Sequence, residues 1–226
     1  LSKALGYVLA EDITSPMDMP PFPQSAMDGY AVKLNGTNTF NLVGEVKAGD
    51  GHEPQLNQGE AIRIFTGAPV TASADLVVRQ EDCNVVENVL EVNPLPKTGA
   101  NIRPKAEQTV SGDIALRKGQ AINAAAIGYL ATLGVTEVSV FPKPKVAILV
   151  TGNELVAPGQ ELNYGQIYES NAIMLQSALT NYGIEQSDVY RVKDDYESTR
   201  DELSKMLSSY DVILCSGGIS VGDYDF

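Results

Sequence analysis

The last third of the chain alternates uninterrupted apolar runs with segments that are apolar on one side only. Residues 145–151 are almost entirely apolar and rich in β-branched side chains, which predicts a strand buried on both faces. A helix is expected to begin at Ser170, a typical N-cap residue, and to end at Gly183. Further strands are expected at about 184–192 and 211–215, with a second amphipathic helix between them. Strands and helices in this order predict a parallel α/β sheet with right-handed crossovers.

Each predicted strand of this sheet leads into a turn that contains an acidic residue. Glu154 follows the first strand, Asp194 the second and Asp225 the third. Because the carboxyl ends of parallel strands meet at one edge, where such sheets bind ligands, we expect the three carboxylates to converge there. Such a group indicates a metal ion, a cationic or amide-rich ligand, or raised pKa values. For any one of them, a helix cap or a solvated loop residue is an equally good interpretation.

A glycine-rich turn follows the third predicted strand. It contains Ser216, Gly217, Gly218 and Ser220. Backbone N–H groups that carry no side chain can approach an anion closely, and phosphate is the natural candidate. A tight turn without a ligand is an equally good interpretation of the two glycines. The spacing matches neither the Walker A motif nor the dinucleotide-binding fingerprint.

The first two thirds of the chain show a different pattern. Residues 22–100 contain short apolar runs separated by Gly, Asn and Pro, which is typical of a β-rich domain, either a sandwich or a barrel. Residues 1–21 and 101–143 flank this region and are expected to form a small mixed linker domain. The α/β domain then covers residues 144–226 and is joined to the rest through a proline-rich junction.

Two local predictions concern these first segments. The apolar run at 85–92 is expected to form one strand of the β-rich domain. Residues 111–143 are expected to be mainly helical, because Ile122, Tyr129 and Leu133 share one helical face.

Two polar residues of the β-rich region stand in short turns. Asp28 precedes Gly29 in a turn before a predicted strand, and Thr66 begins a Thr-Gly-Ala-Pro loop after another. The hydroxyl and the glycine amide of that loop can hold an oxyanion. A plain turn is the more common reason for either sequence.

The composition narrows the class of protein. The chain has 226 residues, and 16 basic against 29 acidic side chains give a net charge of −13, which argues against nucleic acid or an anionic membrane as partner. Cys83 and Cys215 support neither a disulfide framework nor a zinc site and suit a reducing cytoplasm. No apolar run is long enough to span a bilayer. Because the chain starts at Leu1 and stops just after the third strand, we expect a fragment truncated at both ends.

Four motifs in order carry a resemblance to a known family. They are Pro-Gln-Ser-Ala-Met-Asp-Gly-Tyr-Ala-Val at 23–32, Thr-Gly-Ala-Pro at 66–69, Thr-Gly-Asn-Glu-Leu at 151–155 and Ser-Gly-Gly-Ile-Ser-Val-Gly at 216–222. Over essentially its whole length the chain resembles the MoeA family of molybdopterin molybdenumtransferases, to which the E domain of gephyrin is related. The resemblance implies an enzyme of molybdenum cofactor biosynthesis that inserts molybdate into adenylylated molybdopterin and releases AMP.

The resemblance also implies roles for the residues of these motifs. Glu154 and Asp225 would bind Mg²⁺ or molybdate. The other implied roles are catalysis by Asp28, Thr66, Glu154, Asp194 and Asp225, and binding of the pterin phosphate by Ser216, Gly217, Gly218 and Ser220. Members of the family are elongated homodimers whose active site is shared between subunits, so the mixed linker domain of residues 1–21 and 101–143 would also be the dimerisation domain. A molybdopterin adenylyltransferase and downstream proteins that handle the cofactor are implied as partners.

Two other functions fit parts of the sequence. A molybdopterin adenylyltransferase has a similar glycine turn, but it does not need the β-rich region at 22–100. A gephyrin-like scaffold that binds partner peptides would tolerate the loss of the acidic residues. As a fragment, the 226-residue chain is expected to lack turnover by itself.

Overall fold

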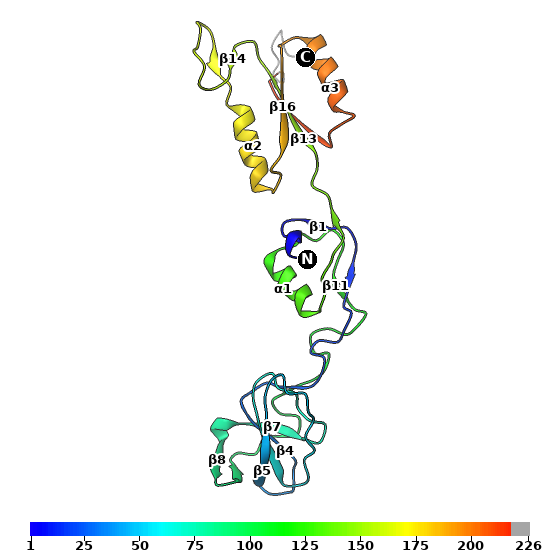
Figure 1. Ribbon diagram of the computed structural model, residues 1–226, viewed down its shortest axis with the longest axis vertical. Helices are drawn as coiled ribbons and strands as arrows, with labels where there is room; N and C mark the ends of the chain where they lie inside the picture. The colour runs from blue at the N-terminus through cyan, green and yellow to red at the C-terminus, as the bar shows by residue number, and fades with distance from the viewer. Residues whose placement is uncertain (218–226) are drawn as a thin grey trace. The chain divides into compact units, whose positions relative to one another are not determined.

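The structure is a computed structural model that describes residues 1–217 (Figure 1). The chain forms two compact units. The first contains Leu1, Glu11–Lys118 and Ala125–Val138, and the second contains Ser2–Ala10, Gly119–Ala124 and the chain from Ser139 onward. The two flanking segments at 1–21 and 101–143 are thus divided between both units. The division into three domains, with a separate linker domain, stays a prediction.

The second unit contains a three-stranded sheet in the order β16-β13-β17. Its strands are β13 (Val146–Thr151), β16 (Ser187–Val192) and β17 (Val212–Ser216), and both pairings are parallel. Helices α2 (Asn171–Asn181) and α3 (Tyr196–Met206) connect the strands. In Figure 1 the two helices lie on opposite sides of the sheet.

The side chains of β13 explain why its sequence is continuously apolar. Ala147 and Leu149 pack with Met206 under α3, whereas Ile148 and Val150 pack under α2. All four are 2 % exposed or less. A central strand covered by a helix on each face needs apolar residues at every position, as the sequence pattern indicated.

The start of α2 differs from the prediction. The side chain of Ser170 makes no capping hydrogen bond. Instead, the buried carboxylate of Glu169 accepts a hydrogen bond from the backbone N–H of Ala172 through Oε1 at 2.8 Å. Helix α3 is capped in the usual way, because Asp195 Oδ1 accepts the N–H of Ser198 at 2.8 Å.

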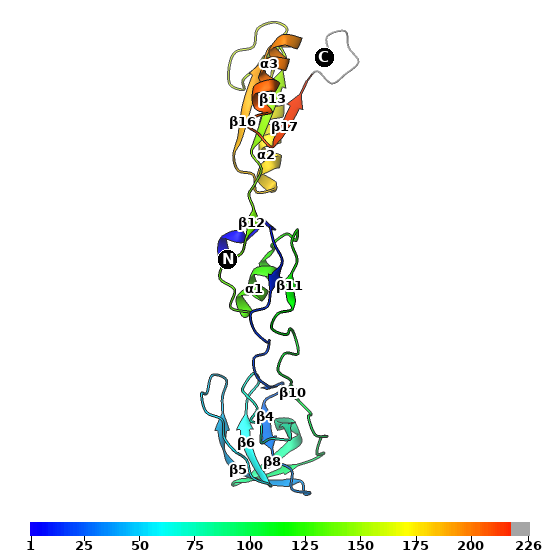
Figure 2. The same ribbon diagram turned by 90° about the vertical axis from the view of Figure 1, so that its right-hand side faces the viewer.

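The first unit contains a six-stranded sheet in the order β7-β4-β6-β5-β9-β8. Only the β5–β6 pair is parallel among these strands. Figure 2 shows β4, β5 and β6 of this sheet. Their apolar side chains form two clusters, one containing Phe40 and Leu76 and the other Ile62 and Val77. The strands are β4 (Gly29–Val32), β5 (Thr39–Val46), β6 (Glu60–Ile64), β7 (Leu76–Arg79), β8 (Cys83–Val86) and β9 (Val89–Val92).

The run at 85–92 is a hairpin rather than one strand. Strands β8 and β9 pair antiparallel and turn at Glu87 and Asn88, with Val86 opposite Val89. Glu87 adopts a φ of +56°, a conformation that glutamate seldom takes. The sequence of the turn, Glu-Asn, is neither Asn-Gly nor Asp-Gly, the pairs that usually mark a two-residue hairpin turn. The sequence therefore contains no sign that residues 85–92 form two strands.

The long helix expected within 111–143 is reduced to α1 (Ala124–Thr132). Before it, β11 (Ile114–Leu116) pairs antiparallel with β2 (Ile13–Thr14), and after it comes β12 (Val140–Phe141). Gly112 and Gly119 have φ values of +92° and +84°. These positive angles end helical geometry on both sides of β11, which is why the helix begins later than expected.

The remaining elements are short. No helix among residues 1–217 is both long and apolar enough to cross a membrane. The short elements are η1 (Ser2–Ala4), β1 (Val8–Leu9), β3 (Gln24–Ser25), η2 (Gln80–Asp82), β10 (Ile102–Arg103), β14 (Leu155–Val156) and β15 (Ile167–Tyr168).

Candidate functional site

The first unit brings Asp28 and Thr66 into direct contact. Asp28 precedes β4 and Thr66 follows β6, and the antiparallel pairing of these strands sets Gly29 opposite Ile64. The backbone N–H and the hydroxyl of Thr66 both donate to Asp28 Oδ1, each at 2.8 Å. Two sequence motifs 38 residues apart therefore form one structure.

The Asp28 carboxylate is held in its ionised form. The backbone N–H of Thr66 is the main cause of the lowered pKa of Asp28, followed by the Thr66 hydroxyl, and the positive charge of Arg63 adds to them. Within residues 1–217 Asp28 Oδ2 takes part in no hydrogen bond, so this oxygen can accept one from a ligand.

Two glycines shape this turn pair. A Cβ on Gly29 would lie 1.8 Å from the carbonyl oxygen of Val78, so only glycine fits there. Gly67 has a φ of +82°, and its N–H donates to the Ser25 carbonyl at 2.8 Å. The loop that presents Thr66 is thus fixed to β3 by backbone hydrogen bonds.

The second unit brings two of the three predicted acidic turns together. Thr151 and Val192 are register partners at the ends of β13 and β16. The backbone N–H of Asp194 donates to Asn153 Oδ1 at 3.4 Å, which joins the turn of Glu154 to the turn of Asp194. Asp225 lies outside the described residues, so the structure leaves its part in this group as a prediction.

The end of β17 lies beside the same edge of the sheet. Ser216 is the register partner of Val150, and its Oγ accepts a hydrogen bond from Asn171 Nδ2 at 2.6 Å. Gly217 has a φ of +103°, and a Cβ there would lie 2.3 Å from Thr151 Oγ1. The predicted phosphate residues Gly218 and Ser220 lie outside the described residues.

The hydroxyl of Thr151 is a further polar group at this edge. Thr151 Oγ1 is buried, and it makes no hydrogen bond in the described part of the chain. An unpaired buried hydroxyl is costly, so its position against the Gly217 turn favours a partner supplied from that side. A ligand oxyanion is a partner of the right chemistry.

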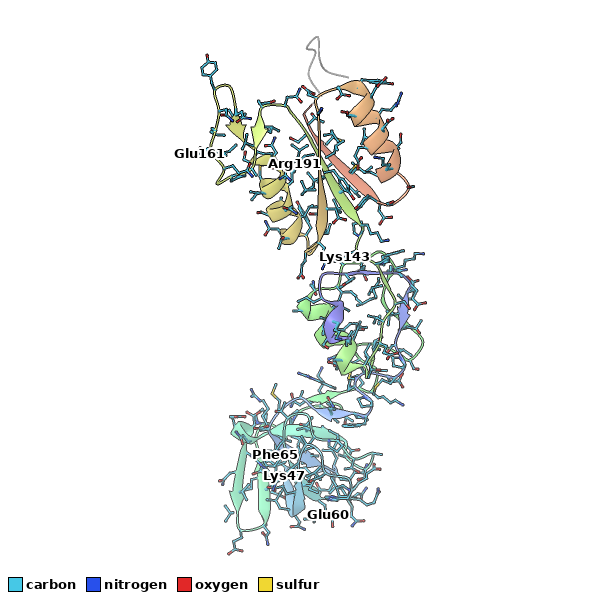
Figure 3. The ribbon with its side chains drawn as sticks, turned by 45° about the horizontal axis from the view of Figure 1, so that its top comes forward. Lys47, Glu60, Phe65, Lys143, Glu161 and Arg191 are labelled. Atoms are coloured by element: carbon cyan, nitrogen blue, oxygen red, sulfur yellow. The ribbon has the colours of Figure 1, made fainter. Side chains whose placement is uncertain are left out.

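Sequence reasoning missed Thr151, Asn171 and Glu169. The side chain of Glu169 is 1 % exposed and pairs at 3.4 Å with Nη2 of Arg191, which Figure 3 labels. An available signal was the Glu-Ser-Asn sequence directly before the predicted helix, since a polar residue at a helix start faces the carboxyl edge of the sheet.

Two carboxylates at this edge are of the type that a hard cation binds, but they do not form a complete metal site within residues 1–217. Mg²⁺ prefers carboxylate oxygens, which Glu154 and Asp194 supply from adjacent turns. Among residues 1–217 no group of three or more His, Cys, Asp or Glu is arranged to hold a metal ion. The predicted ligand pair of Glu154 and Asp225 includes a residue beyond that range.

Comparison with known proteins gives two family matches. Residues 1–134 match the family described as MoeA N-terminal region (domain I and II), and residues 147–226 match the family described as probable molybdopterin binding domain.

Curated relatives and a solved structure are named for the same family as the two matches. A molybdopterin molybdenumtransferase of Staphylococcus epidermidis is 37 % identical over 235 residues, and one of Staphylococcus aureus is 35 % identical over 234 residues. Both alignments cover 100 % of this chain and 56 % of the relative, so the chain spans about half the length of these relatives. A crystal structure of the molybdopterin biosynthesis MoeA protein from Pyrococcus horikoshii has a TM-score of 0.85 and 32 % identity, over 96 % of this chain and 60 % of that one.

Proposed function

Because the chain belongs to the MoeA family, we propose that it contributes to a molybdopterin molybdenumtransferase, which inserts molybdate into adenylylated molybdopterin and releases AMP. One observation supports this proposal most. The turns that follow β13 and β16 are joined at one edge of a parallel sheet, beside the Ser216 turn and the Thr151 hydroxyl, which has no hydrogen-bond partner within residues 1–217. Carboxylates next to an anion-accepting turn suit a ligand that carries both amino groups and phosphate.

The chain's residues would position the substrates rather than bind the transferred metal through sulfur. Carboxylates such as Glu154 and Asp194 would accept hydrogen bonds from the amino-pyrimidine edge of the pterin. The glycine turn from Ser216 to Gly218, with Ser220, would hold the pterin phosphate through backbone N–H groups. Molybdenum would be ligated by the dithiolene of the pterin, which fits a chain that has only two cysteines far apart.

Mg²⁺ is part of this proposal. Glu154 and Asp225 would hold it, and Asp194, whose backbone N–H donates to Asn153, lies in the adjoining turn. When bound, the ion would offset the negative charge of the clustered carboxylates and phosphates.

We also propose a homodimer whose active site is shared between subunits. Asp28 and Thr66 of one subunit would then act with the sheet edge of the other. A molybdopterin adenylyltransferase would supply the adenylylated substrate, and other proteins would accept the finished cofactor. The family match over residues 1–134 favours this function over the adenylyltransferase alternative, which has no need of the β-rich region.

The test compares two glutamates that lie seven residues apart. In a protein of the relatives' full length that carries this sequence, Glu154→Ala is expected to abolish molybdenum insertion while the protein stays folded and dimeric. Glu161→Ala removes the same exposed group from the same connection between β13 and α2 and is expected to retain activity. Full activity of the Glu154→Ala variant would refute the assignment, and a scaffold would then be the better interpretation. The 226-residue chain alone is expected to show no turnover.

A further inference from the structure

The side chain of Arg63 on β6 is held in one position by three neighbours. Its guanidinium carbon lies 4.8 Å from the ring centre of Tyr30 and 5.3 Å from that of Phe65, which Figure 3 labels. Its Nη2 donates to Gln80 Oε1 at 2.6 Å. Stacking on two rings and a short hydrogen bond fix the plane of the guanidinium in advance of any ligand.

Among the described residues 1–217, no Asp or Glu oxygen forms an ion pair with Arg63. Its register partner on β5, Glu45, pairs with Lys47 at 2.9 Å instead. Arg79 of the same sheet, in contrast, forms two hydrogen bonds with Asp82, at 2.8 and 2.9 Å.

The contrast with Arg79 matters because the chain carries a net charge of −13. Carboxylates are abundant, yet the Arg63 guanidinium, which two rings and one hydrogen bond hold, uses one of its five N–H donors on a neutral amide. Fixing a guanidinium in this way is useful when its remaining donors have to meet a planar or tetrahedral oxyanion.

Arg63 belongs to the same corner of the sheet as Asp28 and Thr66. Tyr30, its register partner, follows Asp28 by two residues, and Phe65 directly precedes Thr66. The charge of Arg63 also reaches Asp28, whose pKa it helps to lower after the two hydrogen bonds from Thr66. The corner therefore combines a fixed cation with the unused carboxylate oxygen Asp28 Oδ2.

We propose that Arg63 is an oxyanion-binding residue, and that this corner takes a ligand with a phosphate or similar oxyanion for Arg63 and an N–H group for Asp28 Oδ2. A ligand with only an anionic group would be repelled by Asp28, and one with only neutral N–H groups would give Arg63 no acceptor oxygen. The identity of the ligand as a phosphorylated compound with amino groups rests on the proposed function. Oxyanion binding by Arg63 is a property of this unit that can be measured without turnover.

The probe is adenosine monophosphate, with adenosine as the uncharged comparison. In ¹H–¹⁵N spectra of the 226-residue chain, adenosine monophosphate is expected to shift the Arg63 Nε–Hε signal and the Thr66 amide signal to saturation, whereas adenosine leaves them in place. Arg63→Gln is expected to weaken this binding at least tenfold, because it removes a charge-assisted contact. Arg63→Lys keeps the charge, loses the planar fork, and is expected to give an intermediate affinity.

Arg79→Gln is the matched control, since it removes the same charge from β7, which pairs with β4 on the side away from β6. It is expected to retain affinity within a factor of two. The proposal is overturned if the Arg63 signal does not move in the unmodified chain, if adenosine binds as well as its monophosphate, or if Arg79→Gln loses as much affinity as Arg63→Gln. Oxyanion binding that persists in a full-length protein without molybdenum insertion would overturn the proposed function and leave this site standing.

Discussion

The buried carboxylate of Glu169 offers the sharpest test of how the sheet edge is held. Its Oε1 caps α2 through the N–H of Ala172 at 2.8 Å, and its Oε2 lies 3.4 Å from Arg191. The capped helix begins at Asn171, whose side chain holds Ser216. Loss of the cap should therefore loosen both the helix start and the Ser216 turn.

The two interactions of Glu169 can be separated by magnitude. Removing a helix cap costs about 1 kcal/mol, in a range of roughly 0.5 to 2. The ion pair contributes less, about 0 to 1 kcal/mol, because 54 % of the Arg191 side chain is exposed to water. Glu169→Ala removes both interactions and is expected to destabilise the second unit by about 1 to 3 kcal/mol. Glu169→Gln keeps a carbonyl oxygen for the cap and should cost about 1 kcal/mol or less.

Urea denaturation followed by circular dichroism measures these free energies, and amide hydrogen exchange at Ala172 and Ile173 localises the effect. Faster exchange at these amides is expected in Glu169→Ala and not in Glu169→Gln. If both variants lose the same stability, the ion pair and not the cap holds this helix, and the reasoning fails.

Three further predictions concern other parts of the chain. Gly29→Ala should destabilise the first unit by about 3 kcal/mol or more, because the added Cβ would meet the Val78 carbonyl oxygen. In the control Gly44→Ala of the same sheet, the added Cβ would lie 3.7 Å from Ile62, so the midpoint of urea denaturation should change little. The pKa of Asp28 in the folded protein lies below its ordinary value of 3.8, so the contribution of Asp28 to stability is complete above pH 3.8 and is lost as the pH falls through the folded pKa. The Thr66→Val variant keeps the backbone N–H bond to Asp28 but lacks the hydroxyl. A carboxyl NMR titration of this variant should show the pKa of Asp28 raised part of the way back to 3.8. Burial first and then the charge of Asp82 raise the pKa of Cys83 to about 11, so iodoacetamide at pH 8 should modify exposed Cys215 well before Cys83, and equal rates would contradict this prediction.

The sheet and its edge could be predicted because their signals are local. An apolar run such as 146–151 has few alternatives to a central strand, and parallel pairing then fixes which ends of the strands meet. The turns of Glu154 and Asp194 were expected at one edge for this reason, and the Asp194 hydrogen bond to Asn153 joins them.

Other features depend on contacts between distant residues and could not be read from the sequence. Glu169 replaces Ser170 as the cap because the fold buries its side chain, and the Glu-Ser-Asn sequence does not tell which of its three side chains is buried. Arg63 was not predicted, since its role depends on Tyr30, Phe65 and Gln80 meeting around it. The hairpin at 85–92 was not predicted because Glu87 occupies a turn position that usually carries glycine or asparagine.

The central claim is that Asp28 and Glu154 belong to one active site built from two subunits. Mixing measures this directly: full-length Asp28→Asn and Glu154→Ala proteins, each inactive in molybdenum insertion, are dissociated together and allowed to form mixed dimers. In a shared site one of the two sites in each mixed dimer carries both native residues, so random mixing should restore about a quarter of the native activity. Activity that stays at the level of the separate variants, with mixed dimers shown to form, would contradict the account.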